Sequence, residues 1–130
     1  MGAWLDELHV REGWRARVVV PVPLSKRRLQ HRGFNQASLL AEALGRCAGL
    51  PVDPSRLKRV NDTRSQVGLD PHERWHNVRQ AFQAEARSFE GADVLVVDDL
   101  FTTGATLSAC ATAIRAAGAQ SVVGLTVARA

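Results

Sequence analysis

The chain has 130 residues, of which 45% are hydrophobic and 23% are charged, and this is enough apolar material for one domain with one core. No apolar run is long enough to span a bilayer, and the start resembles neither a signal peptide nor a myristoylation site, so we expect a cytoplasmic protein without membrane insertion. Residues 1–60 carry a net charge of +6 and residues 61–130 a net charge of −2. The basic half either attracts an anion, such as a phosphate ester or a nucleic acid strand, or forms a solvated face, and charge alone does not separate the two.

The two cysteines, Cys47 and Cys110, have no second cysteine or histidine at metal-ligand spacing, so we expect no zinc site. Each cysteine lies in an alanine- and leucine-rich helical pattern, which favours a small buried apolar side chain over a reactive thiol. His72 and His76 are four residues apart but lack a third ligand, so we expect this pair to face solvent.

We expect one domain over residues 1–130, with an N-terminal arm or short helix at residues 1–17 and the core at residues 18–128. A β-branched run over residues 17–23 predicts a buried strand that stops at Pro21. The basic residues that follow, over 25–32, are expected to form a dense loop.

Apolar residues at helical spacing after Asn35 predict a helix that Asn35 caps and that ends at Gly49. Asn35 is an equally good candidate for a ligand contact. Residues 56–83 are less regular, with one short apolar stretch and then a polar loop, in which Asp70 and the following proline mark the start of a helix.

The last forty residues have the clearest pattern. A continuous valine- and leucine-rich run predicts a buried strand over residues 92–99, followed by a loop over 100–104. A helix is expected over residues 105–117, ended by Gly118, and a final strand over residues 121–128. This strand–loop–helix–strand unit predicts an α/β fold of Rossmann-like topology, with a mostly parallel sheet flanked by helices.

Two adjacent carboxylates, Asp98 and Asp99, come at the carboxyl end of the buried strand, where open α/β sheets bind ligands. Because successive strand residues point to opposite sides, we expect the two acids to have different roles. A small, hydroxyl-rich loop opens the next helix and suits a phosphate. Its residues are Thr102, Thr103, Gly104, Ala105 and Thr106.

Acids beside a phosphate cradle repel the phosphate unless they hold something between them. A sugar diol fits, because carboxylates accept hydrogen bonds from hydroxyls, and so does a divalent cation such as Mg²⁺ on Asp98 or Asp99. A ribose 5-phosphate satisfies both halves of the pattern. The alternative is that the two acids only cap the turn and helix that follow them, which leaves the threonines and the glycine unexplained.

Residues 94–107, VLVVDDLFTTGATL, resemble the binding motif for phosphoribosyl pyrophosphate (PRPP) of type I phosphoribosyltransferases. The resemblance implies that Asp98 and Asp99 bind the ribose hydroxyls, with Mg²⁺ as the cofactor of PRPP. It also implies that Thr102 to Thr106 cradle the 5-phosphate.

Residues 20–44, VPVPLSKRRLQHRGFNQASLLAEAL, resemble the signature of the ComF family, which are competence-associated proteins of the phosphoribosyltransferase-like class. Residues 57–82 also resemble this family, so the matches together cover about residues 18–128. ComF-like proteins usually begin with a four-cysteine zinc segment that is absent here, and the resemblance therefore implies PRPP binding more firmly than nucleobase transfer.

The resemblance also implies contacts beyond the acids and the phosphate loop. Residues after the first strand would meet either the pyrophosphate or a DNA backbone: Pro21, Val22, Pro23, Lys26, Arg27, Arg28 and Arg32. Residues 57–82 would include a flexible lid that excludes water from an oxocarbenium-like ribose. Its candidate residues are Thr63, Arg64, Gln66, Arg74 and Asn77.

Two functional hypotheses follow from the resemblance. The first is a Mg²⁺-dependent phosphoribosyltransferase with a role in DNA uptake. The second is a catalytically silent accessory protein of the competence machinery that binds nucleotide or single-stranded DNA. Either protein would be expected to meet a competence helicase or a recombination mediator.

Overall fold

Three parallel strands form the central sheet of this computed structural model, which describes residues 15–60, 70–73, 80–101 and 104–129. The strands are β1 (Val18–Pro21), β4 (Asp93–Phe101) and β5 (Ser121–Arg129), in the order β1-β4-β5. Val18 lies opposite Val94 in the first pair, and Asp93 lies opposite Ser121 in the second. The predicted parallel α/β sheet is therefore confirmed, and β4 runs two residues further than predicted, through Phe101.

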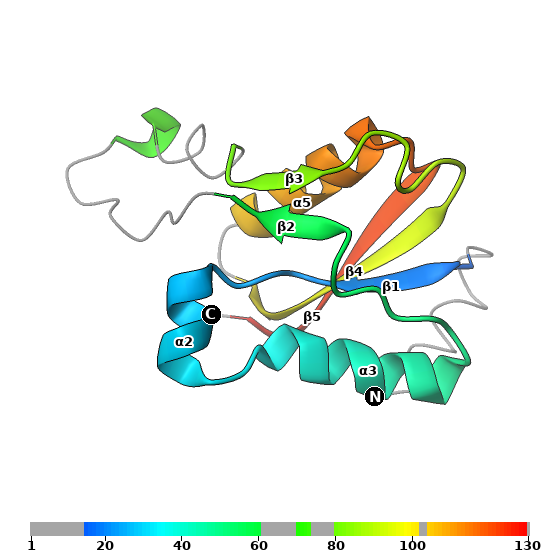
Figure 1. Cartoon of the computed structure of the whole chain (residues 1–130), viewed down its shortest axis with the longest axis horizontal. Helices are drawn as coiled ribbons and strands as arrows, with labels where there is room; N and C mark the ends of the chain where they lie inside the picture. Colours follow the sequence, from blue (N-terminus) through cyan, green and yellow to red (C-terminus); the bar gives the residue numbers. More distant parts are fainter. Residues whose placement is uncertain (1–14, 61–69, 74–79, 102–103, 130) are drawn as a thin grey trace.

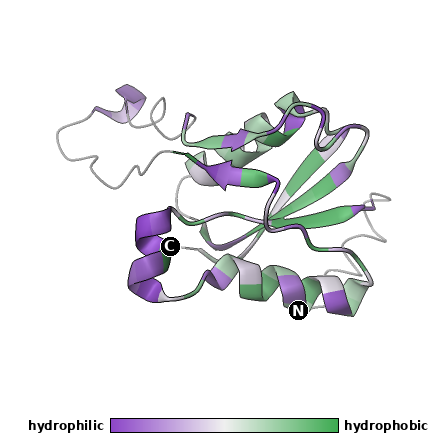
Figure 2. Cartoon of the chain, in the orientation of Figure 1, coloured by the Kyte–Doolittle hydropathy of each residue, from purple (hydrophilic) through white to green (hydrophobic). Residues whose placement is uncertain are grey.

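Helices cover both faces of this sheet (Figure 1). Helix α3 (Gln36–Ala48) packs on one face, where Ala41 and Leu44 meet Leu95 and Val97. Helix α5 (Ala105–Ala116) packs on the other face together with a short antiparallel pair of strands, β2 (Leu57–Arg59) and β3 (Phe82–Ala84). Figure 2 shows mostly hydrophobic residues along β1, β4 and β5.

Side-chain alternation along β4 divides the core into two clusters. Val94 and Val96 face α5 and the β2–β3 pair, whereas Leu95 and Val97 face α3. All four side chains are at most 2% exposed. The continuous apolar run of β4 is thus the result of burial on both faces, as expected for a strand in a covered parallel sheet.

Two sequence predictions are wrong, and one pair of strands was not predicted. Residues 26–32 form a helix, α2 (Lys26–Arg32), and not a loop, because Ser25 caps the first turn and Gly33 closes the last turn at φ 78°. Residues 57–59 and 82–84 form paired strands that the sequence did not indicate. Cys47 is exposed because it lies on the solvent side of α3, whereas Cys110 is buried as predicted.

Several predicted helix boundaries are confirmed. Asn35 caps α3, and Gly49 ends it at φ 68°. Helix α5 begins at the predicted residue, and Gly118 follows its end at φ 102°. The expected N-terminal arm lies mostly outside the described residues. None of the helices in the described ranges has the length and apolar character that crossing a bilayer requires.

Candidate functional site

The parallel strands bring the two predicted binding segments to one edge of the sheet. Strands β1 and β4 run in the same direction, so the segment after Pro21 and the acids at the end of β4 lie at the same carboxyl edge. The Val22 N–H donates to the carbonyl of Val97 at 2.9 Å, which continues the pairing beyond β1 as far as the residue before Asp98. Figure 1 shows helix α2 beside this edge.

Asp98 and Asp99 are both partly buried at the end of β4. In the strand alternation, Asp98 continues the row that faces α5 and the β2–β3 pair, and Asp99 continues the row that faces α3. The two residues nevertheless interact, because the Asp99 N–H donates to Oδ1 of Asp98 at 2.9 Å.

Burial, followed by the hydrogen bond and the negative charge of the Asp99 side chain, raises the pKa of Asp98 to about 6. The Asp99 N–H and the positive charge of Arg59 act in the opposite direction. The two carboxylates therefore repel each other, and a proton, a cation or donating hydroxyl groups would reduce this repulsion.

Arg59 matches the ComF-like pattern in the sequence, but the sequence analysis assigned it no role at the site. It lies on β2, where its guanidinium carbon is 5.1 Å from the ring centroid of Phe82. Its charge lowers the pKa of both Asp98 and Cys110, although burial, followed by the charge of Asp98, raises the pKa of the Cys110 thiol overall. Only the ComF-like pattern around residues 57–82 contained a signal for this position.

The phosphate loop is described from Gly104 onward, and Thr102 and Thr103 lie outside the described residues. Gly104 is the cap residue of α5, with φ 82° and with no side chain to cap the helix. Its carbonyl accepts from the Ser108 N–H at 2.9 Å. Ala105 and Thr106 form the first turn of α5, and both are partly buried. The predicted strand–acid–loop–helix order is thus present at the carboxyl edge of the sheet.

Asn35 holds the loop after β1 in place. Its Nδ2 group donates to the carbonyl of Val22 at 3.0 Å, and its Oδ1 accepts from the Ala37 N–H at 3.0 Å. One side chain therefore caps α3 and ties it to the predicted pyrophosphate segment. These bonds support the capping interpretation of Asn35.

The predicted anion-contact residues divide into two groups. Pro21 and Val22 are buried and Pro23 is partly buried, so these residues form the floor of the loop. The basic residues of α2 are all exposed, and its first turn contains no acidic side chain. These exposed basic residues are Lys26, Arg27, Arg28 and Arg32.

All five predicted lid residues lie outside the described residues: Thr63, Arg64, Gln66, Arg74 and Asn77. The predicted helix start in this segment is described. The Glu73 N–H donates to Oδ1 of Asp70 at 2.8 Å, and the Asp70 N–H donates to Oε2 of Glu73 at 3.2 Å. This reciprocal pair is a capping box.

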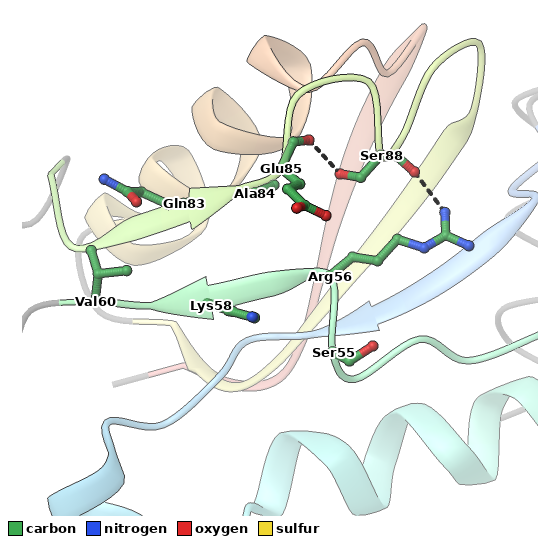
Figure 3. A pocket seen from close by; sticks show the side chains of 8 residues that line it. All are labelled: Ser55, Arg56, Lys58, Val60, Gln83, Ala84, Glu85 and Ser88. Carbon is green, nitrogen blue, oxygen red and sulfur yellow. Dashed lines mark hydrogen bonds between the residues drawn. The ribbon is translucent and has the colours of Figure 1, made fainter.

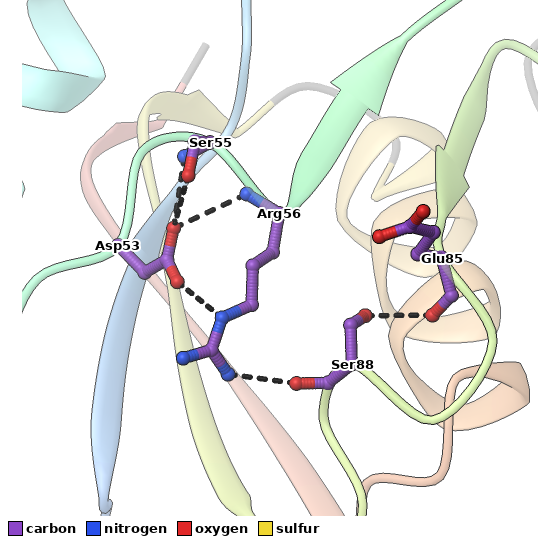
Figure 4. A network of polar contacts seen from close by, with 5 residues as sticks. All are labelled: Asp53, Ser55, Arg56, Glu85 and Ser88. Atoms are coloured by element: carbon purple, nitrogen blue, oxygen red, sulfur yellow. Dashed lines mark hydrogen bonds and ion pairs between the residues drawn. The ribbon is translucent and has the colours of Figure 1, made fainter.

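A cavity of about 450 Å³ lies away from these residues, on the outer side of the β2–β3 pair (Figure 3). Its lining includes Arg56, whose Nε group forms an ion pair with Oδ2 of Asp53 at 2.5 Å and whose Nη1 donates to the carbonyl of Ser88 at 2.7 Å (Figure 4). Burial acts to raise the pKa of Asp53, but hydrogen bonds from Ser55 and Arg56 lower it overall. This network joins the segment before β2 to the turn after β3, so we assign it a structural role.

Residues 29–129 match the phosphoribosyl transferase domain family. Competence protein F of Haemophilus influenzae is 36% identical over 80% of this chain, and competence protein ComFC of Bacillus subtilis is 42% identical over 86%. The chain belongs to the ComF family of phosphoribosyltransferase-domain proteins. These matches cover 46% and 44% of the two relatives, so this ComF chain spans about half the length of the curated relatives it matches.

Solved structures agree on the fold of this ComF chain. A glutamine PRPP amidotransferase from B. subtilis, complexed with ADP and GMP, has a TM-score of 0.58 and 25% identity. The match covers 92% of this chain and 24% of that one. A hypoxanthine phosphoribosyl transferase from Trypanosoma cruzi has a TM-score of 0.60 over 98% of this chain and 60% of its own, at 17% identity, which shows the fold alone. The predicted type I phosphoribosyltransferase-like fold is thereby confirmed.

Proposed function

We propose that this chain binds PRPP, or another ribose 5-phosphate group, at the carboxyl edge of its sheet and acts in DNA uptake. The observation that carries the proposal is the Asp98–Asp99 pair. These two carboxylates repel each other, and they come shortly before the start of α5 at Gly104. Hydroxyl groups of a ribose would donate to the carboxylates, and the N-terminal turn of α5 would receive the phosphate. The names of the competence proteins that the chain resembles support the setting in DNA uptake.

The residues at this edge fit a magnesium ion. Two adjacent carboxylates are oxygen donors, and Mg²⁺ is commonly held by one or two carboxylates together with water and substrate oxygens. Within the described part of the chain, no group of three or more His, Cys, Asp or Glu side chains is placed to hold a metal. Asp98 or Asp99 would therefore hold the ion together with PRPP, and the ion would neutralise charge on the diphosphate.

The loop after β1 would receive the diphosphate. Its buried floor at Pro21 and Val22 is fixed to β4 and to Asn35 by hydrogen bonds of 2.9 and 3.0 Å. A loop held in this way loses little conformational freedom on binding, which favours affinity.

Calorimetric titration of Mg²⁺-PRPP into the wild-type chain tests the proposal. We expect saturable binding that is abolished in the Asp98→Asn/Asp99→Asn double variant. The matched control is Asp93→Asn at the other end of β4, where the carboxylate accepts from the Ser121 hydroxyl at 2.6 Å, and this variant should bind as the wild type does. A cooperatively folded wild-type chain that binds no PRPP would contradict the proposal. Formation of a nucleotide product with added nucleobases would extend it to a transferase.

Helix α2 favours a second function, the binding of single-stranded DNA. Seven consecutive residues contain four arginine or lysine side chains and one histidine, and all are exposed. Like charges at this density repel one another unless a polyanion neutralises them. A DNA strand would therefore bind along α2, next to the PRPP edge.

The salt dependence of DNA binding tests this second function. For a single strand, the slope of log Kobs against log salt should become shallower by about 0.7 for each phosphate that a variant no longer neutralises. We expect Arg27→Gln/Arg28→Gln to reduce both the slope and the affinity for an oligonucleotide. The control Arg46→Gln/Arg115→Gln removes two arginines from the last turns of α3 and α5. Equal effects of both pairs would indicate a general charge effect and would count against a site on α2.

A further inference from the structure

The segment between β1 and α3 is a loop whose two ends are tied together. The Nδ2 group of Asn35 donates to the carbonyl of Val22 at 3.0 Å, and residues 23–34 between these ends contain α2. Figure 1 shows this helix on the outside of the molecule, beside the carboxyl edge of the sheet. None of its seven residues is buried, and residues 26–34 are all exposed. The core therefore does not use this segment, and its surface is open to a binding partner.

The exposed surface of this loop is both basic and apolar. Residues 23–34 contain four arginine or lysine side chains and neither aspartate nor glutamate, so the loop attracts a polyanion. Two large apolar side chains in the same loop are also exposed, Leu29 at 43% and Phe34 at 49%. A ligand that matches this surface is an anion that also presents apolar faces.

Phe34 differs from the phenylalanines that build the core. Phe82 is 4% exposed and Phe89 is 1% exposed, because both pack in the larger core cluster. The backbone on each side of Phe34 is fixed, since the Gly33 N–H donates to a carbonyl of α2 at 2.7 Å and Asn35 caps α3. A half-exposed ring on a fixed backbone loses little conformational freedom when a flat group stacks on it.

We propose that Phe34 stacks on a base of single-stranded DNA whose phosphates lie along the basic side chains of α2. This inference rests on the second function proposed above, and it names the part of the strand that the ring binds. Unpaired bases present aromatic faces, and aromatic side chains beside a basic surface bind such faces with little sequence preference. A membrane surface matches less well, because α2 has only one large apolar side chain and an interfacial helix needs an apolar face along its length.

Fluorescence anisotropy with the full chain tests the proposal. The probes are a labelled thymidine oligonucleotide of about 12 nucleotides and an abasic strand of the same length, which keeps the phosphates and lacks the bases. We expect the wild type to bind the abasic strand roughly 5- to 150-fold more weakly, the range that the loss of one stacked base implies. Phe34→Ala should bind both strands with the weaker affinity.

Further substitutions separate stacking from apolar contact. Phe34→Leu keeps apolar volume without an aromatic face and should lose as much affinity as Phe34→Ala, whereas Phe34→Trp should keep the affinity of the wild type. All three variants should leave the slope of log Kobs against log salt unchanged, because the ring neutralises no phosphate. The matched control is Val60→Ala, which is 46% exposed after β2, in the layer across the sheet from α3, and should bind as the wild type does.

The outcomes distinguish the stacking contact from the function on which it rests. A wild type that binds the two strands equally, or a Phe34→Leu variant that binds as the wild type does, would overturn the stacking contact and leave phosphate binding along α2 intact. A folded wild type that binds neither strand would overturn both, and its binding to phosphatidylglycerol vesicles would then indicate a membrane surface. Circular dichroism checks that the variants fold, and the comparison of the two strands on the wild type requires no variant.

Discussion

At the scale of single residues, Asp98 shows how the fold concentrates charge at the candidate site. The strand direction forces two carboxylates to the end of β4, where burial disfavours the charged form of Asp98 and raises its pKa to about 6. Functional sites often contain such perturbed groups, because binding chemistry needs them where stability alone would exclude them. The cost of this arrangement should be measurable as a loss of stability.

The pH dependence of unfolding tests that cost. A carboxyl group whose pKa is raised from 3.8 to about 6 on folding binds its proton more tightly in the folded state. Its contribution to the free energy of unfolding is therefore complete only below a pH of about 3.8, and it is lost as the pH rises from there through about 6. Asp98→Asn should remove this dependence and raise the free energy of unfolding at pH 7 by roughly 1–2 kcal/mol, a value reduced for solvent screening. Urea denaturation between pH 4 and pH 8 would show it, and parallel curves for the two proteins would contradict it.

At the scale of elements, close approach between α3 and the segment after it depends on Gly45. The carbonyl of this buried glycine accepts from the Leu50 N–H at 2.9 Å. A Cβ atom at Gly45 would lie 2.5 Å from Cγ2 of Val52 and 2.8 Å from the carbonyl oxygen of Leu50. Val52 in turn pairs with β1, so the glycine allows the helix, the chain reversal and the sheet edge to meet.

Gly45→Ala should therefore destabilise the protein although alanine is the better helix former. Propensity alone would add about 1 kcal/mol of stability, but overpacking against a backbone carbonyl should produce a net loss of roughly 1–3 kcal/mol. Adding Val52→Ala removes the methyl group in the way, so the two changes together should cost less than the sum of the single changes. Urea denaturation of the four proteins measures this coupling. A stabilised Gly45→Ala variant would contradict the close packing of Gly45 against Leu50 and Val52.

At the scale of the whole molecule, Phe89 lies in the larger core cluster, where α5 and the β2–β3 pair pack on the sheet. The side chain is 1% exposed within the larger core cluster, and its N–H donates to the carbonyl of Ala117 at 3.1 Å. The guanidinium of Arg56 lies 5.6 Å from its ring centroid. Phe89 therefore connects the turn after β3, the end of α5 and the segment before β2.

Loss of this ring should weaken the entire fold. Phe89→Ala should lower the free energy of unfolding by roughly 3–5 kcal/mol, and Phe89→Leu, which keeps more apolar volume, should cost less. The thiol of Cys110 is a second probe in a Cys47→Ser background, because it is buried and should react with a thiol reagent only when the core opens. Its reaction rate should rise in the order wild type, leucine variant, alanine variant. Equal rates in all three would show that Phe89 does not hold this layer.

Those parts of the molecule that depend on local patterns follow from the sequence alone. The helical spacing and caps of α3 and α5, the buried run of β4 and the placement of Asp98 and Asp99 before a glycine-led helix could all be predicted. These signals arise within a few turns or one strand, where period and capping chemistry act directly.

Tertiary structure decided what depends on residues far apart in the sequence. Strands β2 and β3 have three residues each and are separated by more than twenty residues, too little local signal to indicate their pairing. That pairing is what brings the charge of Arg59 near Asp98. The exposure of Cys47 likewise follows from which surfaces are covered. A local pattern predicts an element, but burial and long-range electrostatics exist only once the elements pack.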